Sequence, residues 1–513
     1  MTLLRNLLII LTCFSAFPEK SAGANSQGKA NSTLITNIQL IDGTGAAARA
    51  AALRIIGGKI VAIGMLEPLP GDDVVDGGGK VLAPGFIDTH SHHDITLLSG
   101  IGELATASQG ITSIIVGQDG GSSYPLAEHF QFISSHPVAV NIGSYSGHNT
   151  LRDKVMGEAS RVATPKEIFR MTALLEADMA AGAFGLSSGL GYEPGLYAAS
   201  EEIIALAQKA AEYGGRYISH IRSEGIELEK ALAEHIEIGR QAKLPVQVSH
   251  IKLAHRRHWG KADKFLRLFE AARAEGIDLT LDIYPYTYWQ STMKILFADR
   301  DYTNRETIEN AFANIVIPEK LVFSNFSPNP DYVGKTIIEI AALRNQDPIT
   351  AYMEMIQEFI AYEKAHPEQV VDEGIMAVSM IEADVDKLMA WSHTNICSDG
   401  SGEAGGHPRG FGSFPRVLGL YTREKGVLTL PQAVHKMTGL PAPHMGIKDR
   451  GLIKEGLQAD LVLFDPETVI DRAELGKPQA ISVGIETVWV NGEITYRDNA
   501  LTGAKPGMVL RRQ

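Results

Sequence analysis

The centre of the chain alternates short apolar runs with amphipathic stretches. Apolar runs of strand length occur between residues 84 and 448, at 85–90, 111–117, 138–144, 183–189, 216–221, 245–251, 278–286 and 394–400. The stretches between them, such as 201–215 and 262–276, repeat apolar residues at helical spacing and end at glycine. Eight strands separated by helices predict an α/β fold, a (β/α)8 TIM-type barrel with a closed parallel sheet.

The two ends of the chain follow a different pattern. Residues 25–83 and 449–513 hold short β-rich runs separated by Gly and Asp turns. We expect these ends to form one small β-sandwich beside the barrel. The stretch from about 290 to 390 is too long for one strand–helix connection, so we interpret it as an inserted subdomain before the last barrel strand and a candidate lid.

The first residues, "MTLLRNLLIILTCFSAF", carry one Arg and then an apolar run shorter than the ~20 residues needed to span a bilayer. Ala22-Gly23-Ala24 follows as a small-x-small cleavage site. Residues 1–24 therefore predict a signal peptide and an exported protein, periplasmic or secreted, with no membrane contact in the mature form. An uncleaved membrane anchor is the alternative.

Composition and net charge limit the classes of function that the protein can have. The chain has 513 residues, 44% of them hydrophobic and 21% charged, as expected of a globular enzyme. Its net charge of -13 and the lack of a Lys/Arg-rich run argue against a nucleic-acid partner. After cleavage only Cys397 would remain, so no disulfide is expected. The sequence leaves the oligomeric state open.

Metal-capable side chains recur where the predicted strands end. Because the carboxyl ends of barrel strands meet on one face, we expect these side chains to converge. They are His90, His92, Asp119, His220, His250 and Asp399. His90 and His92 would point the same way at the end of their strand, and His93 the opposite way. Imidazole and carboxylate are good zinc ligands, so the set predicts a site for one or two Zn2+ ions.

Several stretches resemble the amidohydrolase superfamily, and more narrowly the N-acyl-D-amino-acid deacylases, the D-aminoacylases. They are "APGFIDTHSHHD", "SSGLGYEPGLYA", "YISHIRSEG", "VSHIK", "DIYPY", "SDG" and "HPRGFGSFPRVLG". The last of these is much more specific than His-x-His alone. The resemblance implies a zinc hydrolase that cleaves the amide bond of N-acyl-D-amino acids, with a small N-acyl amino acid as its substrate.

The resemblance also implies roles for individual residues. His90 and His92 would hold one metal position, His220 and His250 the other, and Asp399 would be the catalytic aspartate. One position departs from the family, whose members commonly have "GNCG" with a metal-binding cysteine after strand two. This chain has Gly117-Gln118-Asp119-Gly120 there. A carboxylate can also bind or bridge zinc, so Asp119 is the expected ligand.

The substrate's own carboxylate needs a charged partner. By resemblance, Tyr192, Tyr284 and Arg409 would form this clamp, and Lys252 would face the same side. The alternative for Arg409 is an ion pair with a neighbouring acidic residue such as Glu403.

Two other functions remain open at this point. Cyclic amidases, the dihydroorotases and hydantoinases, typically carry a carboxylated lysine on strand four, where this chain has Ser187 and Ser188. A non-catalytic ligand-binding barrel is the other alternative, supported only by the missing family cysteine.

Overall fold

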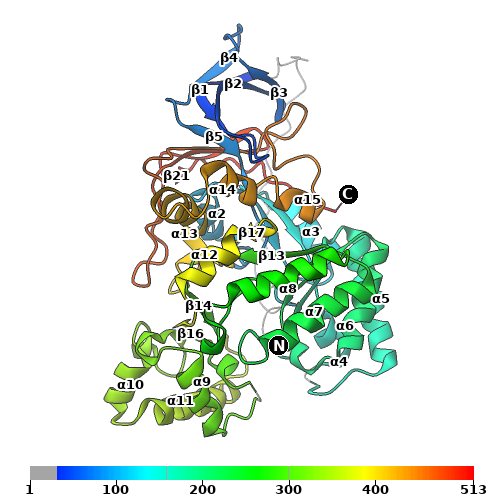
Figure 1. The fold of residues 1–513 in the computed structure, drawn as a ribbon, viewed down its shortest axis with the longest axis vertical. Helices are drawn as coiled ribbons and strands as arrows, with labels where there is room; N and C mark the ends of the chain where they lie inside the picture. Colours follow the sequence, from blue (N-terminus) through cyan, green and yellow to red (C-terminus); the bar gives the residue numbers. More distant parts are fainter. Residues whose placement is uncertain (1–31, 158, 299, 513) are drawn as a thin grey trace, which may run out of the picture.

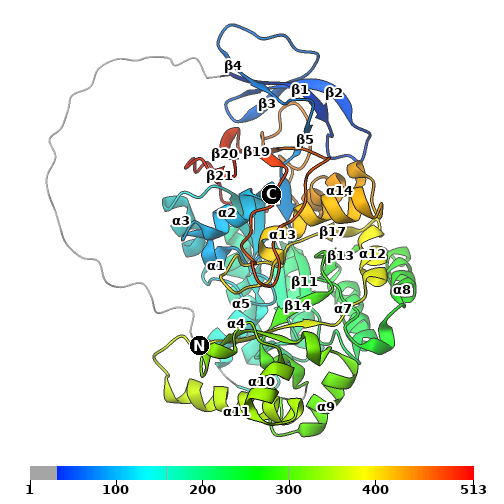
Figure 2. The same ribbon diagram turned by 90° about the vertical axis from the view of Figure 1, so that its left-hand side faces the viewer.

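The structure of the protein is a computed structural model that describes residues 32–157, 159–298 and 300–512. A sheet built from both ends of the chain lies at one end of the molecule, and the inserted helices lie at the other (Figures 1 and 2). The parallel strands lie between them. The predicted signal peptide, residues 1–24, falls outside the described residues. Among the described helices, none combines the length and apolar composition needed to cross a membrane.

The parallel strands form two ladders, β6–β7–β8 and β9–β10–β11–β12–β13–β17. Their bounds are β6 Phe86–Asp88, β7 Ile111–Val116, β8 Asn141–Ser144, β9 Ser146–Gly147, β10 Gly185–Gly189, β11 Arg216–His220, β12 Val246–Val248, β13 Leu279–Ile283 and β17 Thr394–Ile396. Only Tyr145 separates β8 from β9. The Asp399 N–H donates to the His90 carbonyl (2.8 Å), which places the end of β17 beside the end of β6. The first strand thus lies beside the last, as in the predicted (β/α)8 barrel.

Helices follow these strands and bury one face each. They are α2 Ile101–Ala107, α3 Leu126–Ser135, α5 Pro165–Ala181, α6 Ser200–Glu212, α7 Leu228–Ala242, α8 Ala262–Ala274, α12 Glu382–Ala390 and α14 Leu430–Met437. In α7, for example, Leu228, Ala231 and Leu232 are buried at i, i+3 and i+4, which is the spacing of one helical face. Further helices in the connections are α1 Asp94–Leu97, α4 His148–Met156, α13 Arg409–Arg416 and α15 Pro441–Met445.

Both ends of the chain contribute to one nine-stranded sheet. Its strands are β1 Ser32–Leu40, β2 Arg49–Ile56, β3 Lys59–Gly64, β4 Asp72–Asp76, β5 Val81–Pro84, β18 Leu461–Phe464, β19 Ile485–Val490, β20 Glu493–Arg497 and β21 Ala500–Leu501. β5 pairs with β18, and the Ile60 N–H of β3 donates to the Leu457 carbonyl just before β18 (3.0 Å). The sheet thus curls around a core of its own that includes Leu53, Leu82 and Trp489. The terminal strands come together as predicted, in one continuous ladder rather than two separate sheets.

One apolar run of the sequence contributes a strand to each of two sheets. β5 belongs to the terminal sheet and β6 to the parallel strands, and Gly85 alone separates them. A Cβ at Gly85 would lie 2.3 Å from the Thr112 side chain, so only glycine fits where the chain passes between the two sheets.

Between β13 and β17 the chain forms the inserted subdomain (Figure 1). Its strands pair antiparallel in the order β14–β16–β15, with three helices packed nearby. The bounds are β14 Tyr288–Ser291, α9 Arg305–Asn314, β15 Val322–Phe326, α10 Ile337–Arg344, α11 Pro348–Ala365 and β16 Glu373–Val378. Arg300 of this subdomain donates to the Gly191 carbonyl, in the loop that follows β10.

Candidate metal centre

The predicted metal ligands come together at the carboxyl ends of the parallel strands. Two overlapping groups of possible ligand atoms form, each with its atoms within 4.8 Å of one another. One group is His90, His92, Asp119 and Asp399, and the other is Asp119, His220 and His250. His90 and His92 follow β6, Asp119 follows β7, His220 ends β11, His250 follows β12 and Asp399 follows β17.

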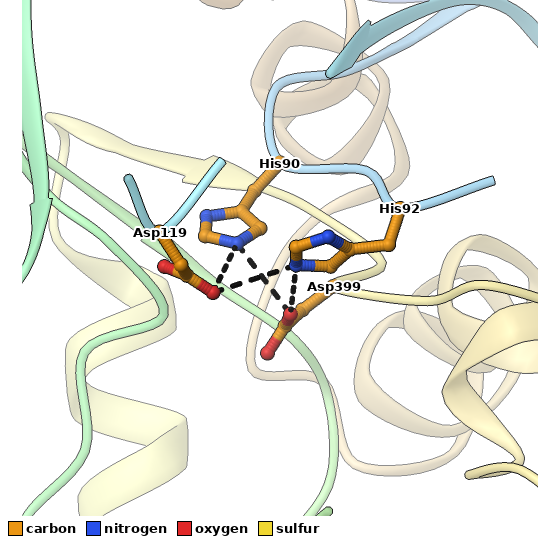
Figure 3. A group of neighbouring side chains, drawn as sticks. All are labelled: His90, His92, Asp119 and Asp399. Carbon is orange, nitrogen blue, oxygen red and sulfur yellow. Dashed lines mark ion pairs between the residues drawn. The ribbon is translucent and has the colours of Figure 1, made fainter. Parts of the chain in front are cut away.

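In the first group, two histidines face two carboxylates (Figure 3). Nε2 of His90 lies 3.4 Å from Oδ2 of Asp119 and 3.4 Å from Oδ1 of Asp399. Nε2 of His92 lies 3.4 Å and 3.3 Å from the same two oxygens. Two nitrogens and two oxygens thus surround a common point, which is an arrangement that can bind a divalent cation.

Asp119 belongs to both groups. Its Oδ2 faces His90 and His92, and its Oδ1 lies 3.2 Å from Nε2 of His250. Nδ1 of His220 lies 3.1 Å from that same His250 nitrogen. A carboxylate with one oxygen toward each group is placed to bridge two metal positions.

The two nitrogens of His220 face opposite ways, and Nε2 lies against Gly191. A Cβ at Gly191 would lie 2.7 Å from Nε2 of His220, so this nitrogen points at the loop after β10. Nδ1 is therefore the His220 atom that faces His250 and Asp119.

Three of the ligand candidates have left-handed backbone. The φ angles are 52° at Asp119, 35° at His250 and 50° at Asp399. Such conformations cost about 1–3 kcal/mol each and cluster at functional sites, and Asp and His tolerate them better than most residues. Each strand thus ends in a sharp turn at the residue that points into the centre.

The centre strongly perturbs the pKa values of its own groups. Burial lowers the pKa of His92, but the carboxylates of Asp119 and Asp399 raise it to about 9. The pKa of Asp399 falls well below its usual value, because Arg409, His250 and His90 outweigh the effect of burial. Burial lowers the pKa of His220 to about 4. Without a metal ion the carboxylates are thus ionised and His220 is neutral, while His92 carries a proton that a metal ion would have to displace.

The donor set fits a metal ion. His90 is fully buried, yet among the described residues neither of its ring nitrogens makes a hydrogen bond. Buried polar groups normally have partners, and a cation beside Nε2 would supply one. Nitrogen and oxygen donors are the ligands that Zn2+ accepts in catalytic sites.

Two carboxylates that the sequence analysis did not single out lie behind the ligands. Oδ2 of Asp282 lies 3.8 Å from Nδ1 of His90, and Asp282 also accepts from the His250 backbone N–H. Oε1 of Glu224 lies 3.1 Å from Nδ1 of His250 and accepts from Lys252 Nζ (2.7 Å). Asp282 stands in "DIYPY" and Glu224 in "YISHIRSEG", so the motifs contained both without indicating their partners.

His93 faces away from the centre, as predicted for alternating side chains. Its Nε2 lies 2.8 Å from the Gly410 carbonyl and its Nδ1 lies 2.9 Å from the Ser91 hydroxyl. His93 thus links the loop after β6 to α13.

The predicted clamp residues surround Asp399 and His220. Nη1 of Arg409 lies 2.7 Å from Oδ2 of Asp399, and its guanidinium lies over the Tyr284 ring at 4.8 Å. The Tyr284 hydroxyl is buried without a hydrogen bond to any described residue. The Tyr192 ring lies 4.4 Å from the His220 ring.

The ion-pair partners of Arg409 and Lys252 differ from those expected from the sequence. The alternative of an ion pair between Arg409 and an acidic residue is found, but the partner is Asp399 and not Glu403, which accepts from the Ser401 hydroxyl (2.9 Å). Lys252 faces the same side as the clamp, but its ammonium is already held by Glu224. Both cations therefore neutralise a carboxylate of the centre in the absence of substrate.

β10, the fourth strand, presents hydroxyls where cyclic amidases have their lysine. Ser187 donates to the Gly117 carbonyl (2.6 Å), and the Ser188 hydroxyl lies 2.6 Å from the Tyr217 hydroxyl. Ser187 thus binds the loop after β7 and Ser188 binds the neighbouring strand β11, and β10 brings no cation to the centre.

Comparisons with known proteins show the family of the chain. The Amidohydrolase family model matches residues 73–289 and 407–496. A D-aminoacylase of Alcaligenes xylosoxydans xylosoxydans is 35% identical over 503 residues, covering 93% of this chain and 97% of the relative. An N-acyl-D-glutamate deacylase from the same organism is 35% identical, covering 92% of this chain and 95% of the relative. The crystal structure of N-acyl-D-glutamate deacylase from Bordetella bronchiseptica, complexed with zinc and a phosphonate mimic of the tetrahedral intermediate, is 33% identical. It has a TM-score of 0.84 and covers 94% of this chain and 100% of its own. The chain therefore belongs to the amidohydrolase family, and within it to the N-acyl-D-amino-acid deacylases.

Proposed function

We propose that the protein hydrolyses the amide bond of N-acyl-D-amino acids and releases a carboxylate and a free D-amino acid. The observation that carries this proposal is the position of Asp399. One of its oxygens lies in the group of His90 and His92, and the other lies 2.7 Å from Arg409. A proton acceptor beside both a metal site and a buried guanidinium suits an amide substrate that carries its own carboxylate.

The metal of this proposal is zinc, as one or two ions. His90, His92 and Asp399 would hold one position and His220 and His250 the other, with Asp119 shared between them. The Bordetella relative binds zinc, and the donor set here is nitrogen and oxygen only. Bound zinc supplies a Lewis acid for the acyl carbonyl and lowers the pKa of a bound water.

The protein's own groups carry the proton. Asp399 takes it from the attacking water and returns it to the departing amine nitrogen. Arg409 keeps Asp399 ionised before substrate binds, because it lowers the pKa of this carboxyl. The same guanidinium is the partner for the carboxylate of the substrate, together with the Tyr284 hydroxyl and Lys252.

This arrangement selects chirality. A substrate held by its carboxylate at Arg409 and by its scissile carbonyl at the metal has only one direction left for its side chain. The inserted subdomain approaches the centre through β14, whose Ser291 hydroxyl is 3.2 Å from the Tyr192 hydroxyl. We propose that this subdomain covers the bound substrate.

The alternatives are cyclic amide hydrolysis and ligand binding without turnover. The serines of β10 count against the first, since they leave no lysine at the position that such enzymes carboxylate. The assembled Asp399 and its metal group count against the second, because a binding module has no use for a proton acceptor there.

A single panel separates these functions. Zinc-loaded protein is tested with N-acetyl D- and L-amino acids and with dihydroorotate and hydantoin, and Asp399→Asn protein serves as the control. Turnover of the D-enantiomers alone, lost in the variant, supports the proposal. Turnover of the cyclic amides alone, or of no substrate, would replace it with one of the alternatives.

We also propose that the protein is exported and functions outside the cytoplasm after cleavage behind Ala24. The apolar run and the small residues within 1–24 support this. N-terminal sequencing of the protein from periplasmic and culture fractions should begin at Asn25. A chain that begins at Met1 in the membrane fraction would favour the uncleaved anchor.

A further inference from the structure

Lys252, Glu224 and His250 form a buried triangle behind the second group of ligands. Lys252 Nζ lies 2.8 Å from Nδ1 of His250 and 2.7 Å from Oε1 of Glu224. The same Glu224 oxygen lies 3.1 Å from Nδ1 of His250. The side chains of His250, Lys252 and Glu224 are only 2%, 5% and 16% exposed, so water does not replace these contacts.

The two neighbours of Nδ1 require opposite tautomers of His250. A lysine ammonium can only donate, so a bond from Lys252 needs a lone pair on Nδ1 and leaves the proton on Nε2. A carboxylate can only accept, so a bond to Glu224 needs the proton on Nδ1 and leaves the lone pair on Nε2. Nε2 is the nitrogen that faces Asp119 and His220.

Only one of these tautomers can bind a metal. A metal ion at the second group needs the Nε2 lone pair, and a proton there would exclude it. Lys252 acting alone on His250 would therefore block the site. Glu224 accepts from Lys252 and also lies 3.1 Å from Nδ1 of His250. It can therefore accept an Nδ1 proton in place of the bond from Lys252 to that nitrogen, and the Nε2 lone pair is then free to ligate.

We infer that Glu224 is a positioning residue that holds His250 in its metal-binding tautomer against the competing donor Lys252. The inference rests on the proposed metal site but not on the identity of the substrate. Outer carboxylates that accept from metal-bound histidines commonly contribute 10- to 100-fold to metal affinity, and here the carboxylate also counters a cation.

The test measures zinc affinity by competition with a fluorescent chelator. Glu224→Gln should raise the zinc dissociation constant of the second site by roughly 10- to 100-fold. The double variant Glu224→Gln/Lys252→Met should recover most of this loss, because the competing donor is gone. Glu229→Gln removes an exposed carboxylate that pairs with Lys264, and it should leave the affinity unchanged.

A second readout needs neither metal nor substrate. Nitrogen-15 shifts of metal-free protein, with the His250 signals assigned by their loss in His250→Gln, should show the proton on Nδ1 in the parent. In Glu224→Gln the proton should move to Nε2.

The inference is overturned if Glu224→Gln binds zinc like the parent. Equal losses in the single and double variants, or a proton on Nε2 in the metal-free parent, would overturn it too. Because affinity and tautomer are read directly, a protein that hydrolyses none of the N-acyl-D-amino acids would refute the proposed function and leave this test intact.

Discussion

Replacing Arg409 by alanine would remove a buried cation that neutralises Asp399. Its Nη1 is 2.7 Å from Oδ2 of Asp399. At an effective dielectric constant of about 20, that separation gives roughly 6 kcal/mol of attraction before desolvation is subtracted. Removing one partner of a buried pair costs about 3–5 kcal/mol, because the other charge stays buried alone. We expect the unfolding free energy of the metal-free protein to fall by about this amount, and by less with zinc bound beside Asp399.

The kinetic effect should depend on the substrate. Nε of Arg409 is buried and has no hydrogen-bond partner among the described residues, so the guanidinium has a donor left for a second carboxylate. Loss of such a contact costs about 2–5 kcal/mol, or roughly 30- to 5000-fold in kcat/KM. We expect this loss for an N-acetyl-D-amino acid. The control substrate is the N-acetyl amine that has the same side chain but no carboxylate. Its kcat/KM should fall less, because Arg409 can affect its hydrolysis only through Asp399.

Arg416→Ala is the matched control. Arg416 ends the same helix, α13, pairs with Asp471 at 3.1 Å and lies over the Tyr286 ring at 4.8 Å. Its removal should lower stability and affect both substrates alike. If Arg409→Ala also reduced kcat/KM equally on both substrates, Arg409 would support only Asp399 and the fold, and the carboxylate clamp would be refuted.

Asp399→Asn should lower turnover by at least ~100-fold at saturating zinc while most of the metal remains bound, and near-normal kcat would exclude Asp399 as the proton acceptor. Asp119→Ala should lower the zinc content measured by elemental analysis, since both groups lose their shared carboxylate; unchanged content would make Asp119 a turn residue. Burial raises the pKa of Glu373 in β16 from 4.5 to about 8, so its stabilising effect is complete below pH 4.5 and is lost as the pH rises toward 8. The Tm of Glu373→Gln should therefore exceed that of the parent by a margin that grows between pH 5 and pH 8. A Tm difference that stays constant over this range would contradict this ionisation.

The ligand candidates could be found in the sequence because barrel topology converts chain order into spatial proximity. Residues at the ends of parallel strands must share a face, whatever lies between them. His90 and Asp399 are therefore neighbours although most of the chain separates them. The loop geometry that turns Asp119 and His250 inward needed left-handed backbone, which those residue types tolerate.

The partners of the charged residues could not be predicted in the same way. Arg409 follows two acidic residues in the sequence, and only the fold of the loop after β17 decides for Asp399 over Glu403. Glu224 is four residues from His220 but lies beside His250, which follows the next strand. Likewise, the division of one apolar run at Gly85 depends on its contact with Thr112 of β7, which no local pattern contains.

The pairing of β5 with β18 has a consequence for folding during synthesis on the ribosome. β5 is synthesised before the barrel, but its second neighbour is among the last segments to emerge. Until then one edge of β5 is unpaired, and its buried residues Val81, Leu82 and Ala83 lack the part of their cover that β18 supplies. Open apolar edges recruit strands from other chains. β18 closes this edge, and we therefore expect chains terminated before β18 to associate with one another through β5.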